Sequence, residues 1–201
     1  MTTVCVILAA GRSERMGAQK LLLPFGTTTL LGRALEAASD FSIVVVVAPA
    51  LVAHVTARPN LTVIVNGAPE RGMAHSLAMA DAAIADRGAA LAVLLGDTPL
   101  VDAALVRRIV AARGDADVAY PVRGGIAGHP VIFGPSVRPE LARLAAGDTL
   151  RSLRDDPSRR RSEVHIDEEA PYLDVDTPQD LARAHAALAR IMEPGARNAP
   201  F

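Results

Sequence analysis

Hydrophobic positions along this 201-residue chain follow two alternating patterns. Short runs rich in β-branched residues predict strands near residues 4–8, 42–48, 61–65, 91–95, 117–122 and 130–133, with a weaker one near 163–166. Longer Ala- and Leu-rich stretches with helical spacing predict helices near residues 29–38, 73–86, 103–112, 136–145 and 178–192. Residues 44–47 are apolar at every position, which predicts strands covered on both faces.

This alternation of strands and helices predicts an α/β fold in three layers, with helices on both faces of a doubly wound, mainly parallel sheet. We expect residues 1–192 to form a single domain and residues 193–201, which contain two prolines and a glycine, to form a flexible tail. The last helix has the clearest start signal. Thr177 can cap it, Pro178 suits its first turn, and Asp180 completes a capping box.

Composition and charge exclude several classes of protein. The 21 basic residues nearly balance the 22 acidic ones, and a net charge of −1 argues against a nucleic-acid-binding surface. Cys5 is the only cysteine, so the chain forms neither an internal disulfide nor a cysteine-based zinc site, and we expect Cys5 in the core. No apolar run approaches the ~20 residues needed to span a bilayer. Without a signal-peptide pattern, we expect a cytoplasmic protein with no membrane partner.

The loop after the first predicted strand is a candidate anion-binding site. Its candidate residues are Leu8 at the strand end, the small residues Ala9, Ala10 and Gly11, and the basic residues Arg12, Arg15 and Lys20. Small residues allow a tight turn whose backbone N–H groups converge on an anion, and the three cations suit a triphosphate. Lys20 is the only lysine among the 21 basic residues, which indicates a role that the planar guanidinium of arginine does not fill. The loop lacks the Walker and Rossmann patterns, and a solvated turn is the alternative.

Two aspartates are candidate metal ligands. Asp97 follows the buried strand near residues 91–95, and in the common 3-2-1-4 strand order it lies opposite the loop that ends at Lys20. Asp176 ends another extended segment, just before the helix capped by Thr177. Two such carboxylates can hold Mg²⁺, with water and phosphate oxygens completing the shell. The alternatives are a turn-forming role for Asp97 and a helix-start role for Asp176.

The segment from Leu8 to Pro24 resembles the signature of the molybdenum cofactor nucleotidyltransferases, especially their cytidylyl-transferring branch. Its pattern reads L-A-A-G-x-S-x-R-M-G-x-x-K-L-L-L-P. Further family-like segments follow in the same order as in the family: G-M-A-x-S-L from Gly72, L-G-D-x-P from Leu95, G-H-P-V from Gly128 and D-V-D-T-P from Asp174. The resemblance covers most of the chain, and the ordered set is far more specific than the first motif alone.

The resemblance implies a glycosyltransferase-A-like, Rossmann-like nucleotidyltransferase fold and an Mg²⁺-dependent reaction. An acceptor phosphate on a molybdopterin-type cofactor attacks the α-phosphorus of a nucleoside triphosphate, and pyrophosphate leaves. Lys20, Arg15 and Asp97 are the implied catalytic residues, and Asp97 and Asp176 the implied metal ligands. The Ala9-Ala10-Gly11 sequence resembles the CTP-using form, whereas GTP-using relatives read Ala-Gly-Gly. A methyl group at Ala10 narrows the pocket against a purine.

Three further regions complete the predicted site. Asn66 and Ser76 are candidate base or ribose contacts, with turn-forming and helix-start roles as the alternatives. The resemblance puts Gly128 and His129 on the acceptor side, although a loop histidine is the ordinary interpretation. Residues 147–151 depart from the family's Gly-Asp-x-Gly-Ala-Arg pattern. Open alternatives are therefore a GTP-using or a sugar- or polyol-phosphate nucleotidyltransferase, and a nucleotide-binding chaperone that delivers cofactor to a recipient molybdoenzyme without turnover.

Overall fold

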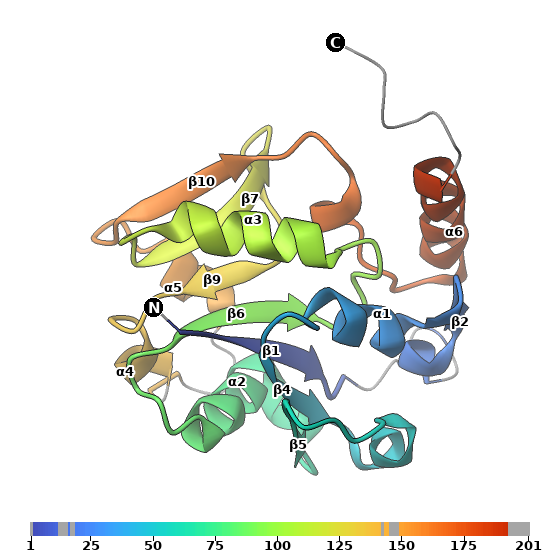
Figure 1. Ribbon diagram of the computed structural model, residues 1–201, viewed down its shortest axis with the longest axis horizontal. Coiled ribbons are helices and arrows are strands. Elements are labelled where there is room, and N and C mark those ends of the chain that lie inside the picture. Colours follow the sequence, from blue (N-terminus) through green and yellow to red (C-terminus); the bar gives the residue numbers. More distant parts are fainter. Residues whose placement is uncertain (1, 12–15, 17–18, 142, 145–148, 193–201) are drawn as a thin grey trace.

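The computed structural model describes residues 2–11, 16, 19–141, 143–144 and 149–192. They form an α/β fold around one eight-stranded sheet (Figure 1). Seven strands lie in the order β10-β7-β9-β6-β1-β4-β5, and β8 pairs with β7. The strands are β1 (Thr3–Ala9), β4 (Ser42–Val47), β5 (Leu61–Val65), β6 (Ala90–Leu95), β7 (Val118–Arg123), β8 (Ile126–Ala127), β9 (Val131–Phe133) and β10 (Arg161–His165). The expected 3-2-1-4 order corresponds to β5-β4-β1-β6 and is confirmed.

The sheet is mainly parallel, as the sequence predicts. Strand β1 pairs in parallel with both β4 and β6, and β10 pairs in parallel with β7. Strand β9 is the exception among the long-range pairings, since it runs antiparallel to both β6 and β7. The carboxyl ends of β1 and β6 therefore meet at one edge of the sheet, where α/β proteins bind ligands.

Helices cover both faces of this sheet. Three helices, α1 (Leu30–Ala37), α3 (Ala103–Arg113) and α6 (Pro178–Met192), contribute to one apolar cluster. The opposite cluster draws on α2 (Gly72–Ala83), α4 (Arg138–Leu141) and α5 (Leu150–Arg154). Short 3₁₀ turns lie at η2 (Lys20–Leu22), η3 (Pro49–His54), η4 (Pro69–Arg71) and η5 (Ala170–Tyr172), and β2 (Pro24–Phe25) pairs with β3 (Thr28–Thr29).

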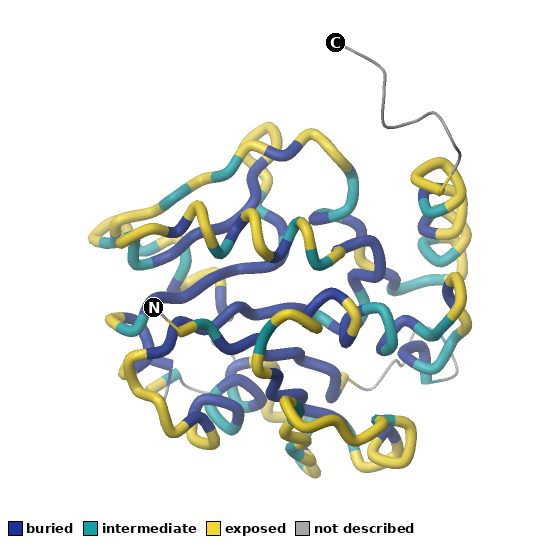
Figure 2. Tube along the Cα trace, viewed as in Figure 1, coloured by how far each residue is buried: buried dark blue, intermediate teal, exposed yellow. Residues whose placement is uncertain are grey.

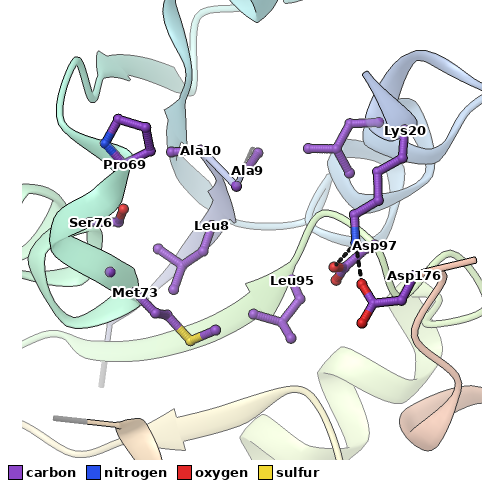
Figure 3. A pocket seen from close by; sticks show the side chains of 13 residues that line it. Leu8, Ala9, Ala10, Lys20, Pro69, Met73, Ser76, Leu95, Asp97 and Asp176 are labelled. Carbon is purple, nitrogen blue, oxygen red and sulfur yellow. Dashed lines mark hydrogen bonds and ion pairs between the residues drawn. The ribbon is translucent and has the colours of Figure 1, made fainter. Parts of the chain in front are cut away.

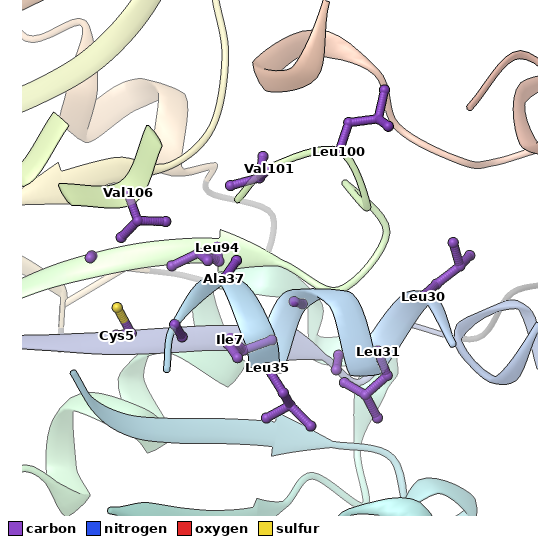
Figure 4. Packing of buried hydrophobic residues seen from close by; sticks show 14 of the residues in the cluster. Cys5, Ile7, Leu30, Leu31, Leu35, Ala37, Leu94, Leu100, Val101 and Val106 are labelled. Atoms are coloured by element: carbon purple, nitrogen blue, oxygen red, sulfur yellow. The ribbon is translucent and has the colours of Figure 1, made fainter. Parts of the chain in front are cut away.

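Strand β1 explains why the central strands are apolar at every position. Cys5 and Ile7 pack into the cluster under α1 and α3, whereas Val4 and Val6 pack into the cluster with α2. Figure 4 shows the first cluster, with Cys5 among its members, and Figure 2 shows that the central strands are buried along their length. Because successive side chains point to opposite faces, a strand between two helical layers needs apolar residues throughout. No helix among the described residues is both long and apolar enough to cross a bilayer.

Side-chain caps fix the starts of α1, α3 and α6. The Thr29 hydroxyl accepts a hydrogen bond from Gly32 N at 3.1 Å at the start of α1, and Asp102 caps α3 in the same way. At α6 the predicted capping box is present. Asp180 N donates to Thr177 Oγ1 at 3.2 Å, and Thr177 N donates to Asp180 Oδ2 at 2.9 Å. The bounds of α6 agree with the prediction.

Two helix predictions were wrong in extent. The helix predicted over residues 136–145 is represented by α4, which spans only Arg138–Leu141, and Pro139 lies in its first turn. The helix predicted over residues 73–86 ends at Ala83, because the Arg87 and Arg138 guanidinium groups bind the carbonyl oxygens of Asp81 and Ile84. The sequence patterns did not predict α5.

A buried ion pair joins α2 to α4. Arg138 is 1% exposed, and its Nε donates to Asp81 Oδ1 at 2.6 Å. Its remaining nitrogens donate to backbone carbonyl oxygens of Asp81, Ile84, Asp86 and Ala89, all at or just after the end of α2. The second carboxylate oxygen of Asp81 accepts from the exposed Arg87 at 2.6 Å. This set of bonds satisfies a guanidinium that burial alone strongly disfavours.

Candidate active site

A cavity of about 460 Å³ opens at the carboxyl ends of β1 and β6 (Figure 3). It lies where the strand order reverses, between β1 with its neighbour β4 on one side and β6 on the other. Its lining residues are Leu8, Ala9, Ala10, Gly11, Lys20, Leu21, Pro69, Gly72, Met73, Ser76, Leu95, Asp97 and Asp176. One end is polar, with Lys20 and two carboxylates, and the other is formed by small and apolar side chains and Ser76.

The polar end is an ion triad centred on Lys20. Its Nζ donates to Asp97 Oδ2 and to Asp176 Oδ1, both at 2.7 Å. Burial opposes the charge of this ammonium group, but the two carboxylates outweigh burial and raise the pKa of Lys20. The triad therefore holds a lysine that is fully protonated at neutral pH.

Three separate elements bring this triad together. Lys20 begins η2, Asp97 follows β6, and Asp176 lies just before α6. Val175 N donates to the Asp97 carbonyl oxygen at 2.9 Å, which fixes the segment before α6 against the end of β6. The capping box of α6 also holds the backbone of Asp176 itself, because Asp176 N donates to Asp180 Oδ2 at 3.3 Å. A local helix-start signal thus positions one of the two carboxylates beside Lys20.

The two carboxylates fit the requirements of a divalent cation. Asp97 Oδ1 is buried and makes no hydrogen bond with any described residue. A buried carboxylate oxygen without a partner is costly, so this atom is suited to bind a cation. Within the described ranges no group of three or more His, Cys, Asp or Glu side chains can hold a metal. Asp97 and Asp176 could together hold a divalent ion such as Mg²⁺, which commonly takes one or two carboxylates and completes its shell with water and substrate phosphate.

Asp174 is a third carboxylate close to this site. Burial raises its pKa to about 6, and the nearby charges of Asp97 and Asp176 add to the increase. Asp174 lines a second, smaller cavity, described below. It was not among the predicted site residues, although its motif D-V-D-T-P was noted.

Gly11 follows β1 and is the last described residue before Met16. Gly11 lines the opening, and no described atom lies within 4 Å of the position that a Cβ at Gly11 would take. The expectation that Gly11 allows a tight turn stays a prediction, since residues 12–15, which follow it, lie outside the described ranges. Arg12 and Arg15, which were predicted to bind anions here, lie outside the described residues.

The opposite wall combines Ser76 with a residue behind it. Ser76 lies in α2 and lines the cavity, whereas Asn66 is fully buried after β5 and does not line it. Asn66 Nδ2 donates to Ser76 Oγ at 2.9 Å. The two predicted nucleotide contacts therefore lie together, but only Ser76 reaches the cavity.

A second cavity of about 320 Å³ lies on the other side of Met73, which lines both cavities. His129 lines this second cavity together with Asp174, Tyr172 and the arginines of α5, Arg151 and Arg154. His129 Nδ1 is 3.5 Å from the Val93 carbonyl oxygen, and burial lowers the pKa of this histidine. The two arginines were not predicted as site residues. No sequence pattern predicted the helix that carries them.

Gly128, the other predicted acceptor residue, does not line either of these cavities. It is buried where the chain passes close to η5, and an added Cβ would lie 2.8 Å from the Tyr172 ring. His129 N donates to the Pro171 carbonyl oxygen at 2.9 Å along the same contact. Gly128 therefore supports the wall of the second cavity through close backbone packing.

Comparison with known proteins gives consistent matches over most of the chain. Residues 5–164 match the family model described as the MobA-like NTP transferase domain. The chain is 32% identical over 184 residues to the molybdenum cofactor guanylyltransferase of Xanthomonas euvesicatoria, with 89% of this chain and 92% of the relative covered. It is 27% identical over 186 residues to the molybdenum cofactor cytidylyltransferase of Escherichia coli, with 90% and 94% covered.

Solved structures share this fold over most of the chain. The crystal structure of Rv0371c from Mycobacterium tuberculosis superposes with a TM-score of 0.81 at 32% identity, covering 92% of this chain and 98% of that one. A manganese complex of the same protein superposes with a TM-score of 0.76 at 28% identity, with 92% and 99% covered.

Proposed function

The chain belongs to the MobA-like NTP transferase family, and from this premise we propose that it transfers CMP from CTP to the phosphate of a molybdopterin-type cofactor. The observation that carries the proposal is the triad of Lys20, Asp97 and Asp176 at one end of a cavity of nucleotide size. The sequence similarity to a molybdenum cofactor cytidylyltransferase, which covers 90% of this chain, supports the proposal.

The proposed reaction joins two phosphates without a protein nucleophile. An oxygen of the acceptor phosphate forms a bond to the α-phosphorus of CTP, the bond from that phosphorus to the β-phosphate oxygen breaks, and pyrophosphate leaves with the electron pair. Asp97 and Asp176 would hold Mg²⁺, which supplies neutralising charge to phosphate oxygens when bound. A manganese complex of a relative supports a divalent ion here.

The chain's own residues position the phosphates and neutralise their charge. Lys20 donates hydrogen bonds from a compact ammonium group. Because it lies beside Asp97 and Asp176, it could reach the phosphates that a cation on these carboxylates would hold. Arg15 adds a second cation from the same loop. Catalysis by positioning and by charge neutralisation is the general pattern for phosphate transfer.

The apolar end of the cavity suits the nucleoside. Leu8, Ala9, Ala10 and Gly11 form its floor, Ser76 its far wall, and Asn66 supports Ser76 from behind. The buried methyl group of Ala10 reduces the width available to a purine. The similarity to a guanylyltransferase keeps GTP as the second candidate nucleotide.

The second cavity is the proposed acceptor side. It contains His129 and two arginines, and it borders the nucleotide cavity at Met73. Gly128 keeps its wall close to η5. An acceptor held there would present its phosphate toward Asp97 and Lys20. A recipient molybdoenzyme is the proposed partner for the product.

The experiment is a thermal-shift titration with CTP, GTP, ATP and UTP in the presence of Mg²⁺, followed by pyrophosphate release on addition of molybdopterin. We expect CTP to raise the melting temperature most and to support release. Preferential stabilisation by GTP would contradict the proposed base. Binding without pyrophosphate release would favour the delivery role instead, and no shift with any nucleotide would refute the proposal.

A further inference from the structure

The hydrogen bond between Asn66 and Ser76 has a defined direction. The Ala68 backbone N–H donates to Asn66 Oδ1 at 2.8 Å. A backbone N–H is only a donor, so the Asn66 amide oxygen must face Ala68 and the amide nitrogen must face Ser76. Asn66 is therefore the donor and Ser76 Oγ the acceptor in the 2.9 Å bond between them.

This direction leaves the Ser76 hydroxyl proton available. A serine hydroxyl donates one hydrogen bond and accepts up to two, and the Asn66 amide uses acceptor capacity only. No described residue accepts a hydrogen bond from the Ser76 hydroxyl. Ser76 is 5% exposed and lines the cavity. Its remaining capacity as a donor is therefore available to a ligand in that cavity.

We propose that Asn66 is a positioning residue for nucleotide choice, because it makes Ser76 a hydrogen-bond donor toward the base. This inference rests on the proposed function, since it needs a nucleoside at the apolar end of the cavity. An available donor favours a base edge rich in acceptors. Cytosine presents its ring nitrogen N3 and carbonyl O2 side by side, whereas the corresponding edge of guanine presents two N–H donors, N1–H and N2–H, beside its single acceptor O6.

The selectivity has a simple physical origin. A guanine N–H can be accepted only by a free lone pair of Ser76, and the Ser76 hydroxyl proton is then left without an acceptor on that edge of the base. One of its lone pairs is already held by Asn66. A buried donor without an acceptor is costly, and sites built around one hydrogen-bond direction reject ligands of the opposite direction strongly.

The substitution Asn66→Asp tests this direction with little change in shape. An aspartate side chain only accepts, so it keeps the bond from Ala68 N–H but requires the Ser76 proton for the second bond. The Ser76 donor toward the cavity is then lost. We expect the dissociation constant for CTP to rise about tenfold more than that for inorganic triphosphate. A tenfold change is the size expected for the loss of one hydrogen bond. Affinity for GTP should change no more than affinity for inorganic triphosphate.

Inorganic triphosphate and a matched variant serve as controls. Triphosphate reports the general repulsion from a new carboxylate. Asn60→Asp makes the same chemical change at an exposed site, where Asn60 Nδ2 donates to the Phe41 carbonyl oxygen at 2.7 Å. It should leave the preference for CTP over GTP unchanged. Ser76→Ala should reduce this preference as Asn66→Asp does, and combining the two should add little, because they remove the same bond.

Several outcomes would overturn the inference. Equal changes for CTP, GTP and triphosphate in Asn66→Asp would show that only charge matters, and additive losses in the double variant would show that the residues act separately. If Asn66→Asp fails to fold, an unchanged CTP preference in Ser76→Ala overturns the proposal by itself. Wild-type protein that binds no nucleotide would refute the proposed function, whereas nucleotide binding with these negative results refutes only the role of Asn66.

Discussion

The buried Arg138 predicts a large loss of stability when its charge is removed. Arg138→Met keeps the apolar length of the side chain but removes the guanidinium that binds Asp81 and four backbone carbonyl oxygens at the end of α2. Breaking one partner of a buried pair costs about 3–5 kcal/mol, because the other charge stays buried. Arg87 still binds Asp81 at 2.6 Å, so we expect a value near the lower limit, about 3 kcal/mol.

Urea unfolding followed by circular dichroism measures this loss. With an m value of about 2 kcal/mol/M, a change of about 3 kcal/mol moves the midpoint by about 1.5 M. Arg87→Met is the matched control, since it removes the same charge from the same carboxylate. The Arg87 side chain is 55% exposed, so its pair with Asp81 should contribute no more than about 1 kcal/mol. Equal losses in the two variants would refute the argument from burial.

Three further predictions concern the site and its supports. Lys20→Arg should lower turnover about 100-fold or more with little loss of melting temperature, because a planar fork replaces a compact ammonium group; activity close to wild type would contradict a special role for this lysine. Thr177→Ala should cost about 1 kcal/mol at pH 7. The Thr177 hydroxyl lowers the pKa of Asp180, so this stabilisation is present above the ordinary aspartate pKa and is lost as pH falls through the lowered value. Unfolding of both proteins from pH 2 to 7 should therefore show the difference shrinking in acid, and a constant difference would refute the linkage. Gly128→Ala should weaken acceptor use more than CTP binding, measured as separate KM values, because a Cβ there overlaps the Pro171 carbonyl oxygen.

Much of the fold follows from local patterns. The strand predicted over residues 61–65 has the same bounds as β5, and the helix over residues 178–192 the same bounds as α6. These elements have signals within themselves, such as an unbroken β-branched run or a capping box. The carboxyl-end position of Asp97 follows from its place after a buried strand. Lys20 was also singled out by its residue type, and it lines the cavity.

The remaining features depend on contacts between distant segments. The end of α2 is fixed by Arg138, more than 50 positions away in sequence, and no helical pattern records this contact. Lys20 and Asp176 are 156 positions apart, so only the assembled sheet brings them to hydrogen-bond distance. Asn66 was predicted to touch the ligand, but it is buried behind Ser76 and does not line the cavity. Sequence spacing identifies the residue types, and tertiary packing decides which atoms face the cavity.

The single lysine also makes the site accessible to amine chemistry. Because Lys20 is the only lysine in the chain, its ε-amino group is unique, and only the amino terminus offers another primary amine. Acylating reagents attack a neutral amine, and the bonds to Asp97 and Asp176 keep this one protonated. The rate of acylation at Lys20, read by mass spectrometry, therefore reports how often these bonds open. The wild-type chain thus carries, without any added label, a reporter of how often Lys20 leaves the two carboxylates.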